Sequence, residues 1–173
     1  GTVGHMTHAL LEDQDTDLMR YKVKQGRVLY GVDMKIVNDD GTPLPQDGKA
    51  FGELCVRGPW VTNGYFEDES TSASSFDNEN WFRTGDVATI DPHGYMEVVD
   101  RSKDVIKSGG EWISSIELEN IAIGHAAVAE AAVIGIEHEK WGERPLLVCV
   151  KADDINASGE EILSIYEGKV AKW

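Results

Sequence analysis

The segment WFRTGDVATIDPHGYMEVVDRSKDVIKSGGEWIS, residues Trp81–Ser114, decides the fold of the region around it. Alternating apolar residues after Thr84-Gly85-Asp86 predict a strand, and Asp91-Pro92-His93-Gly94 has the composition of a turn. The run Tyr95–Val99 then predicts a returning strand. We therefore expect an antiparallel hairpin whose turn is centred near His93.

The open end of this hairpin should bring a carboxylate and a guanidinium together. With the turn near His93, Asp86 would pair with Val99 or Asp100, which leaves Arg101 within roughly 5–8 Å of Asp86. An ionised carboxylate can accept both hydrogen bonds of a vicinal diol, and an adjacent guanidinium can donate to ribose or phosphate oxygens. The pair therefore fits a nucleotide ribose. A surface ion pair that adds little stability is the alternative interpretation of the same spacing.

Three stretches of the chain together resemble a known family. RTGD at Arg83–Asp86 and GYMEVVDRSKDVIKSGGEWISSIELE at Gly94–Glu119 are similar to two signature regions of the adenylate-forming superfamily. That superfamily includes acyl-CoA synthetases, peptide-synthetase adenylation domains and luciferases. GELCVRGPWVTNGYF at Gly52–Phe66 resembles a third signature, at about the distance before RTGD that the family has. The resemblance continues to the region of WGERPLLVCV at Trp141–Val150.

The resemblance implies roles for three residues around the end of the hairpin. Asp86 and Arg101 match the positions that contact ribose and phosphate in the family. Lys103, two residues after the hairpin arginine, matches the hinge about which the C-terminal domain of the family rotates. From its own neighbourhood in the sequence, Lys103 is a solvated lysine.

The resemblance also implies a second group of residues that act in thioester formation. Lys107 matches a lysine that lies near the adenylate in the thioester-forming conformation, although its pattern alone indicates a solvent-facing strand lysine. Gly109-Gly110 and the neighbouring Trp112 would border the tunnel for the pantetheine arm of coenzyme A. A simple hairpin turn is the alternative for the two glycines, which permit positive φ angles and close approach of a ligand.

We expect an α+β chain of two parts. Residues 1–102 would be the end of the large AMP-binding domain, with a small β-barrel-like unit from about residue 26, and residues 103–173 a partial, mobile C-terminal domain. No Pro/Gly linker marks the join, which the resemblance supplies. In the second part, Ser114 with Glu117 has a capping-box pattern at the start of a helix.

Two further expectations concern aromatic side chains and the end of the chain. We expect Trp60, Trp81 and Trp141 to pack in cores, because aromatic side chains bury large areas. A last helix should begin near Ser158 and extend with amphipathic spacing to Lys169.

Composition excludes several classes of function. The chain has 31 acidic and 16 basic residues and a net charge of −15, which argues against binding to nucleic acid or to an anionic membrane surface. The most apolar run, Ala126–Ile136, is too short for a membrane span, which needs roughly twenty residues, and the N-terminus lacks a signal-peptide pattern. Cys55 and Cys149 indicate reduced thiols and a cytoplasmic setting. The five histidines show no zinc pattern.

Several parts of the family machinery have no match in this sequence. There is no GxxxxGK[ST] loop, and the family's own phosphate loop, magnesium ligand and most of its adenine pocket would lie upstream. The family's adenylation lysine stands in a PKTxxGK-like context, which Lys169 and Lys172 do not resemble. We therefore expect an internal fragment of a longer synthetase, inactive when isolated, with the Mg²⁺ ligand outside this chain.

The resemblance implies a ligase that activates a carboxylic acid with ATP and transfers the acyl group to coenzyme A. GPWVTNGYF and SGGEWISSIELEN are most similar to fatty-acyl-CoA synthetases, so a medium- or long-chain fatty acid is the expected substrate, with short sulfur-containing acids left open. The alternatives are an enzyme that loads a carrier protein and a non-catalytic scaffold module that keeps the fold. A homodimer is left open as well.

Overall fold

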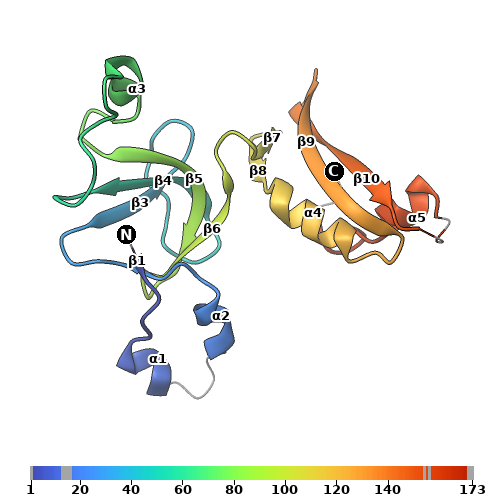
Figure 1. The fold of residues 1–173 in the computed structure, drawn as a ribbon, viewed down its shortest axis with the longest axis horizontal. Coiled ribbons are helices and arrows are strands. Elements are labelled where there is room, and N and C mark those ends of the chain that lie inside the picture. Colours follow the sequence, from blue (N-terminus) through green and yellow to red (C-terminus); the bar gives the residue numbers. More distant parts are fainter. Residues whose placement is uncertain (1, 13–16, 154, 156, 171–173) are drawn as a thin grey trace. The chain divides into compact units, whose positions relative to one another are not determined.

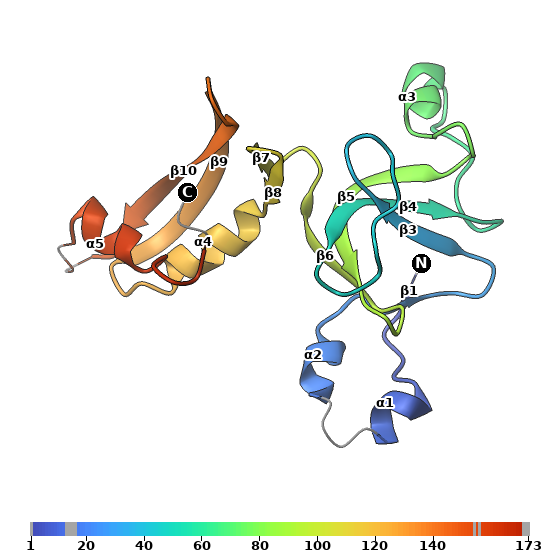
Figure 2. The ribbon, with the colours of Figure 1, turned by 180° about the vertical axis from the view of Figure 1, so that it is seen from behind.

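The computed structural model describes residues 2–12, 17–153, 155 and 157–170. The chain separates into two compact units, Gly1–Ser102 and Lys103–Trp173, and each is described by itself. Figure 1 and Figure 2 show the elements from two opposite sides. None of the helices in the described residues is both long enough and apolar enough to cross a membrane.

The first unit is built on an antiparallel sheet with the strand order β3-β4-β5-β6, and β1 and β2 form a separate two-stranded sheet. Its elements in chain order are β1 (Thr2–Val3), α1 (His8–Glu12), α2 (Leu18–Lys22), β2 (Arg27–Val28), β3 (Asp33–Val37), β4 (Phe51–Arg57), α3 (Glu69–Ser74), β5 (Phe82–Ile90) and β6 (Met96–Arg101). The predicted hairpin is therefore the β5–β6 pair, at the end of this sheet.

Both faces of the four-stranded sheet are covered. Successive side chains of a strand point to opposite faces, so Ile36 and its neighbour Val37 enter different clusters. Ile36 packs with Leu54 and other buried residues on one side, and Val37 packs with Cys55 and Trp81 on the other. Two covered faces make the sheet a rigid base for side chains at its strand ends.

The expected β-barrel-like shape is met only loosely. In the order β3-β4-β5-β6 the outer strands β3 and β6 do not pair with each other within the described residues, so the sheet is open. The mixed helix and strand content agrees with the expected α+β class.

The segment before β3 is tied to the turn of the β5–β6 hairpin. Lys24 Nζ lies 2.7 Å from Asp91 Oδ2, with 4% and 6% of the two side chains exposed. Tyr95 is fully buried, and its hydroxyl donates to the carbonyl of His5 and accepts from the amide of Thr7. Lys24 and Asp91 are 67 residues apart in the sequence, so local sequence patterns cannot predict that they form a pair.

The second unit has a four-stranded sheet with the order β8-β7-β10-β9. Its elements are β7 (Ile106–Ser108), β8 (Glu111–Ile113), α4 (Ser115–Ile123), β9 (Val128–His138), β10 (Gly142–Lys151) and α5 (Gly159–Ser164). The predicted start of α4 is confirmed, because the Ser114 side chain accepts a hydrogen bond from the amide of Glu117. Ser158 and Glu161 form a reciprocal capping box at α5.

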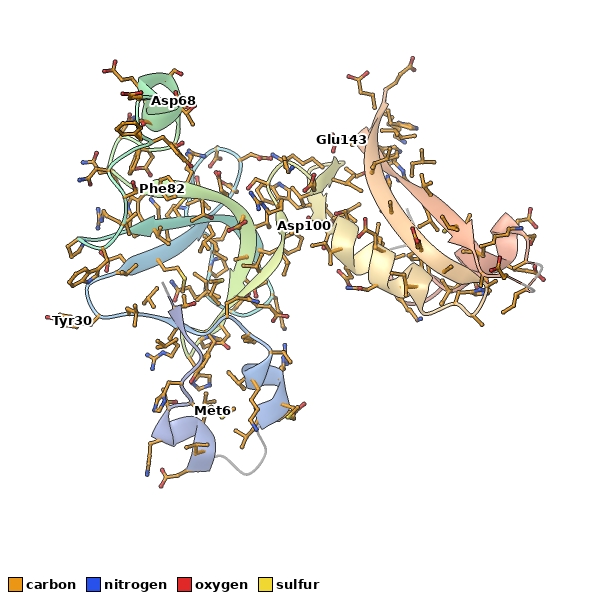
Figure 3. The ribbon with its side chains drawn as sticks, viewed as in Figure 1. Met6, Tyr30, Asp68, Phe82, Asp100 and Glu143 are labelled. Atoms are coloured by element: carbon orange, nitrogen blue, oxygen red, sulfur yellow. The ribbon has the colours of Figure 1, made fainter. Side chains whose placement is uncertain are left out.

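Two expectations are wrong. Helix α5 ends at Ser164 instead of continuing to Lys169, and the chain continues in turns that include Gly168 at φ 75°. Trp81 is buried, but Trp60 is 75% exposed, and its indole nitrogen donates to the carbonyl of Tyr30 on the surface. Tyr30 itself points away from the sheet (Figure 3).

Candidate functional site

Asp86 on β5 and Arg101 on β6 are direct cross-strand partners at the open end of the hairpin. Arg101 Nε lies 3.1 Å from Asp86 Oδ1, and the two side chains are 57% and 31% exposed, respectively. The carboxylate is therefore held by the guanidinium but still reachable from solvent. The arrangement predicted from the sequence, a carboxylate and a guanidinium at one strand end, is present.

The predicted register of this pair was wrong. Asp86 was expected to face Val99 or Asp100, but the ladder shifts just beyond Val87, whose partner is Asp100. A β-bulge leaves Val99 as an extra residue on β6, and this brings Arg101 directly opposite Asp86. The bulge makes the contact closer than a regular hairpin would.

Backbone and hydroxyl contacts fix the position of Asp86. The Thr84 hydroxyl donates to the carbonyl of Leu54 on the neighbouring strand and accepts from the amide of Asp86. Gly85 has a φ of 75°, a left-handed conformation that favours glycine. The amide of Ser102 donates to the carbonyl of Gly85, which extends the pairing one step past Arg101. The family-like triplet Thr84-Gly85-Asp86 thus has a structural reason for each residue.

A second carboxylate lies next to the pair. Asp100 is 1% exposed, and its Oδ1 accepts a hydrogen bond from the amide of Arg101 (Figure 3). This bond holds the backbone from which the Arg101 side chain leaves. Sequence reasoning missed this residue, because an aspartate before an arginine at a strand end gives no sign that its side chain is buried.

The arrangement can position a ligand but holds no group suited to attack. A partly exposed carboxylate can accept two hydroxyl hydrogens, and the guanidinium beside it can donate to oxygen. The buried hydroxyl of Ser102 has no hydrogen-bond partner among the described residues. Buried polar atoms are normally paired, with protein or with water, so this hydroxyl has capacity for a further hydrogen bond.

The described part of the chain contains no cluster of metal-binding side chains, because no group of three or more His, Cys, Asp or Glu side chains is arranged there to hold a metal ion. Asp86 already pairs with a cation, the Arg101 guanidinium, which disfavours a second positive charge beside it.

The predicted residues of the second unit lie around the tight turn between β7 and β8. Lys107 and Trp112 are cross-strand partners, and Lys107 Nζ lies 4.7 Å from the centroid of the Trp112 ring. The amide of Lys107 donates to Glu143 Oε2, which joins this turn to β10 (Figure 3). Lys107 is exposed, as the sequence pattern predicts for a solvent-facing strand lysine.

The two glycines of this turn differ in their surroundings. Both have positive φ, 62° at Gly109 and 86° at Gly110. A Cβ at Gly109 would lie 2.9 Å from Trp141 Cε3, and the amide of Gly109 donates to the carbonyl of Trp141. A Cβ at Gly110 would meet nothing within 4 Å. Gly109 is thus required by packing, whereas Gly110 is open toward solvent.

Lys103 is the first residue of the second unit and is exposed in a turn. It forms no ion pair within the part of the chain that the structure describes. Lys169 is exposed in the turns after α5, and Lys172 lies outside the described residues.

Comparison with known proteins identifies the family. The model of the AMP-binding enzyme family matches residues 2–66, and that of the AMP-binding enzyme C-terminal domain matches residues 117–173. The chain belongs to the AMP-binding enzyme family. The hairpin that carries Asp86 and Arg101 lies between the two matched ranges.

Relatives of this AMP-binding chain are CoA ligases. It is 55% identical over 154 residues to 3-methylmercaptopropionyl-CoA ligase of Ruegeria lacuscaerulensis, covering 89% of this chain and 28% of the relative. It is 52% identical over 149 residues to the medium-chain-fatty-acid–CoA ligase of Ectopseudomonas oleovorans, covering 86% and 27%. The chain therefore spans less than a third of the length of these relatives.

A solved structure gives the same assignment for the fold. The structure of o-succinylbenzoate CoA synthetase from Bacillus subtilis in complex with its acyl-adenylate intermediate superposes with a TM-score of 0.73 at 36% identity. The match covers 89% of this chain and 31% of that one. The α+β architecture is thus that of an adenylate-forming enzyme.

Proposed function

We propose that this chain is the ribose-binding and pivot region of an ATP-dependent acid–CoA ligase. In that reaction the substrate carboxylate attacks the α-phosphorus of ATP, pyrophosphate leaves, and an acyl-adenylate forms. The thiol of coenzyme A then attacks the acyl carbon and AMP leaves. The observation that carries the proposal is the Asp86–Arg101 contact of 3.1 Å at the open end of β5–β6, in a chain of this family.

Asp86 and Arg101 would act by positioning. Asp86 would accept the two ribose hydroxyls, and Arg101 would keep the carboxylate ionised and donate to the nucleotide. Interactions of this kind contribute orientation and charge stabilisation rather than bond making. The bulge at Val99 and the Thr84 hydroxyl support the role, because they hold both groups on a sheet covered on two faces.

The second unit would serve the thioester-forming step. Lys103 would be the residue about which it rotates, and Lys107 would approach the adenylate after the rotation. Gly110 and Trp112 would border the path of the pantetheine arm. The open space at Gly110 and the exposure of Lys107 support these assignments.

The acid is proposed to be a medium- or long-chain fatty acid or a short sulfur-containing acid. The names of the relatives above support both classes, and the sulfur-containing acid belongs to the relative with the higher identity of the two. Loading of a carrier protein is the second candidate for the acceptor. The free thiols of Cys55 and Cys149 support a cytoplasmic enzyme.

A chimera tests the proposal without requiring the rest of the protein. This chain would replace the matching 154 residues of the Ruegeria ligase, and acid-dependent exchange of pyrophosphate into ATP would be measured. Asp86→Ala should weaken the use of ATP by about 2–4 kcal/mol, or about 30- to 900-fold. Asp33→Ala is the matched control, because Asp33 forms the same kind of cross-strand pair with Arg57. Equal ATP kinetics in both variants would assign Asp86 to a surface ion pair.

The same chimera separates the two half-reactions. Lys103→Pro fixes φ near −65° and removes a donor, so acyl-CoA formation should fall while pyrophosphate exchange persists. Lys103→Ala should leave both half-reactions intact, because only backbone freedom is required. Gly110→Leu should also reduce acyl-CoA formation, and Gly110→Asn, which tolerates the left-handed conformation, separates crowding from strain. Parallel loss of both half-reactions in Lys103→Pro would remove the pivot role.

A further inference from the structure

The two faces of the β9–β10 ribbon are unlike. On one face Ala131, Val133, Leu147 and Cys149 pack against the helices and buried residues of the second unit. On the other, five large apolar side chains are 42% to 54% exposed: Ile134, Ile136, Leu146, Val148 and Val150. The ribbon is drawn in orange and red in Figure 1. We call these five residues the outer face.

The outer face is continuous. Leu146 pairs with Ile134, and the next rung joins Val148 to Ala132. Directly opposed residues in an antiparallel ladder point to the same side of the sheet, so the apolar side chains form two adjacent columns. β9 is also an outer strand of its sheet. Contiguous exposed apolar patches of this kind mark interaction surfaces.

Opposite charges stand at the two ends of the outer face. Glu130 on β9 pairs with Val150 at one end, and Arg144 on β10 pairs with Ile136 at the other. The two rungs are six residues apart along each strand, about 20 Å at roughly 3.4 Å per residue. Neither side chain forms an ion pair within residues 2–12, 17–153, 155 and 157–170.

We propose that the outer face binds the outer face of a second copy of this chain. Only one kind of two-fold axis brings the negative Glu130 end of one copy to the positive Arg144 end of the other. An axis in the interface and nearly perpendicular to the strands places Glu130 of each copy over the Ile136–Arg144 rung of the other, with Arg144 on the neighbouring strand. The strands of the two copies then cross within about 30°, as in aligned sheet packing. An axis parallel to the strands would bring the two Glu130 side chains to the same end, which like charges oppose.

The size of the surface sets the strength of the dimer. Five aliphatic side chains cover much less than the roughly 800 Å² per partner of a standard interface. The two charge pairs lie at its ends, where they select the arrangement more than they add affinity. The dimer should therefore be weak and should dissociate on dilution.

Sedimentation equilibrium of the 173-residue chain, from micromolar to millimolar concentration, tests the proposal. The chain should pass from monomer to dimer and stop there. Val148→Glu should abolish the dimer, and Leu163→Glu on α5 should leave it unchanged, because Leu163 is equally exposed but lies off the outer face. Circular dichroism confirms that both variants fold.

Charge reversal tests the predicted axis. Glu130→Arg alone and Arg144→Glu alone should each raise the dissociation constant about tenfold or more, because each places like charges together twice in the dimer. The double variant should restore the dimer of the original chain. A monomer at every concentration, insensitivity to Val148→Glu, or a double variant that stays weak would each overturn the proposal. So would a longer protein that is monomeric and covers the outer face with another of its own segments.

Discussion

The β3–β4 and β5–β6 hairpins of the first unit carry the same pair of residues in the same relation. Asp33 faces Arg57 across β3 and β4, and Asp86 faces Arg101 across β5 and β6. The first pair is looser, with 3.4 Å between Asp33 Oδ2 and an Arg57 terminal nitrogen and with 68% of the Asp33 side chain exposed. The cross-strand pairing of these residue types therefore does not by itself make a site.

The surroundings separate the two pairs. The Arg57 guanidinium also lies 4.4 Å from the centre of the Trp81 ring, so it is already engaged. The Asp86–Arg101 pair instead has the Val99 bulge on one strand and the left-handed Gly85 on the other, and the buried carboxylate of Asp100 precedes Arg101. β-Bulges are over-represented next to active sites, so the irregular backbone is the feature in which the Asp86–Arg101 pair differs from the Asp33–Arg57 pair.

The connections of the two hairpins differ as well. In the turn of β5–β6, Asp91 accepts from the amides of His93 and Tyr95 and forms the buried pair with Lys24. The loop between β3 and β4 has exposed local contacts, such as the bond from the Thr42 amide to Asn38. The hairpin with the candidate site is thus held at both ends.

Breaking the buried pair should have the largest effect. Lys24→Met leaves the Asp91 carboxylate buried without its cation, and we expect the free energy of unfolding of this chain to fall by about 3–5 kcal/mol. Urea denaturation followed by circular dichroism measures it. Lys24→Met with Asp91→Asn should lose less than the sum of the two single changes. Additive losses would mean that the two side chains are not coupled.

The pH dependence of the stability of Lys24→Met tests whether the loss comes from the Lys24–Asp91 ion pair. Burial of Asp91 raises the pKa of its carboxyl, but the bonds from Lys24 and from the Tyr95 amide outweigh this and hold the pKa below the ordinary value of 3.8. The stability from Asp91 is therefore complete above pH about 3.8 and is lost as the pH falls through the lowered pKa. In Lys24→Met the hydrogen bond and the charge of Lys24 are lost, so the pKa of the buried Asp91 carboxyl should be higher than in the original chain. The stability difference between the two proteins should shrink on acidification, and a difference independent of pH would contradict the ion-pair account.

Altering the left-handed glycine next to Asp86 should have a smaller effect. Gly85→Ala places a Cβ in a left-handed conformation, which costs about 1–2 kcal/mol, although nothing lies within 4 Å of the new atom. Gly4→Ala is the matched control, because Gly4 has open space without a positive φ. Thermal unfolding of both variants separates conformational strain from bulk, and equal melting temperatures would show that position 85 tolerates a side chain.

The exposed pair should matter least. Asp33→Ala should change the free energy of unfolding by less than about 1 kcal/mol, as is usual for surface ion pairs. The measurement uses the same urea titration at low and at high salt. Because salt screens exposed charges, a loss above about 1 kcal/mol that persists at high salt would show that the β3–β4 pair is more than a surface contact.

Local features were predictable from the sequence, and features set by distant residues were not. The turn at Asp91 and the Ser114 cap depend on residues within a few positions, and both are present. The register of Asp86 was wrong because a bulge depends on how two strands fit together. The Lys24–Asp91 pair joins elements far apart in the chain, and the exposure of Trp60 depends on what packs near it, so neither could be read from local patterns.

The family resemblance supplied what local patterns could not. The hairpin pattern placed Asp86 near Arg101, and the resemblance matched both residues to positions that contact ribose and phosphate in the family; the structure places the two side chains 3.1 Å apart. The resemblance could not supply Asp100, because the burial of that side chain depends on the fold around it. The roles of the site residues in both units stay predictions, and the chimera tests them.

The two thiols give each unit its own chemical reporter. Cys55 in the first unit is 1% exposed, and burial, followed by the charge of Glu53, raises its pKa to about 11. Cys149 in the second unit is half-buried on β10. Only the thiolate reacts with alkylating reagents, so labelling of Cys55 requires the first unit to open. Mass spectrometry of alkylated chains would therefore time the opening of the first unit through Cys55, with the half-buried Cys149 of the second unit as an internal comparison.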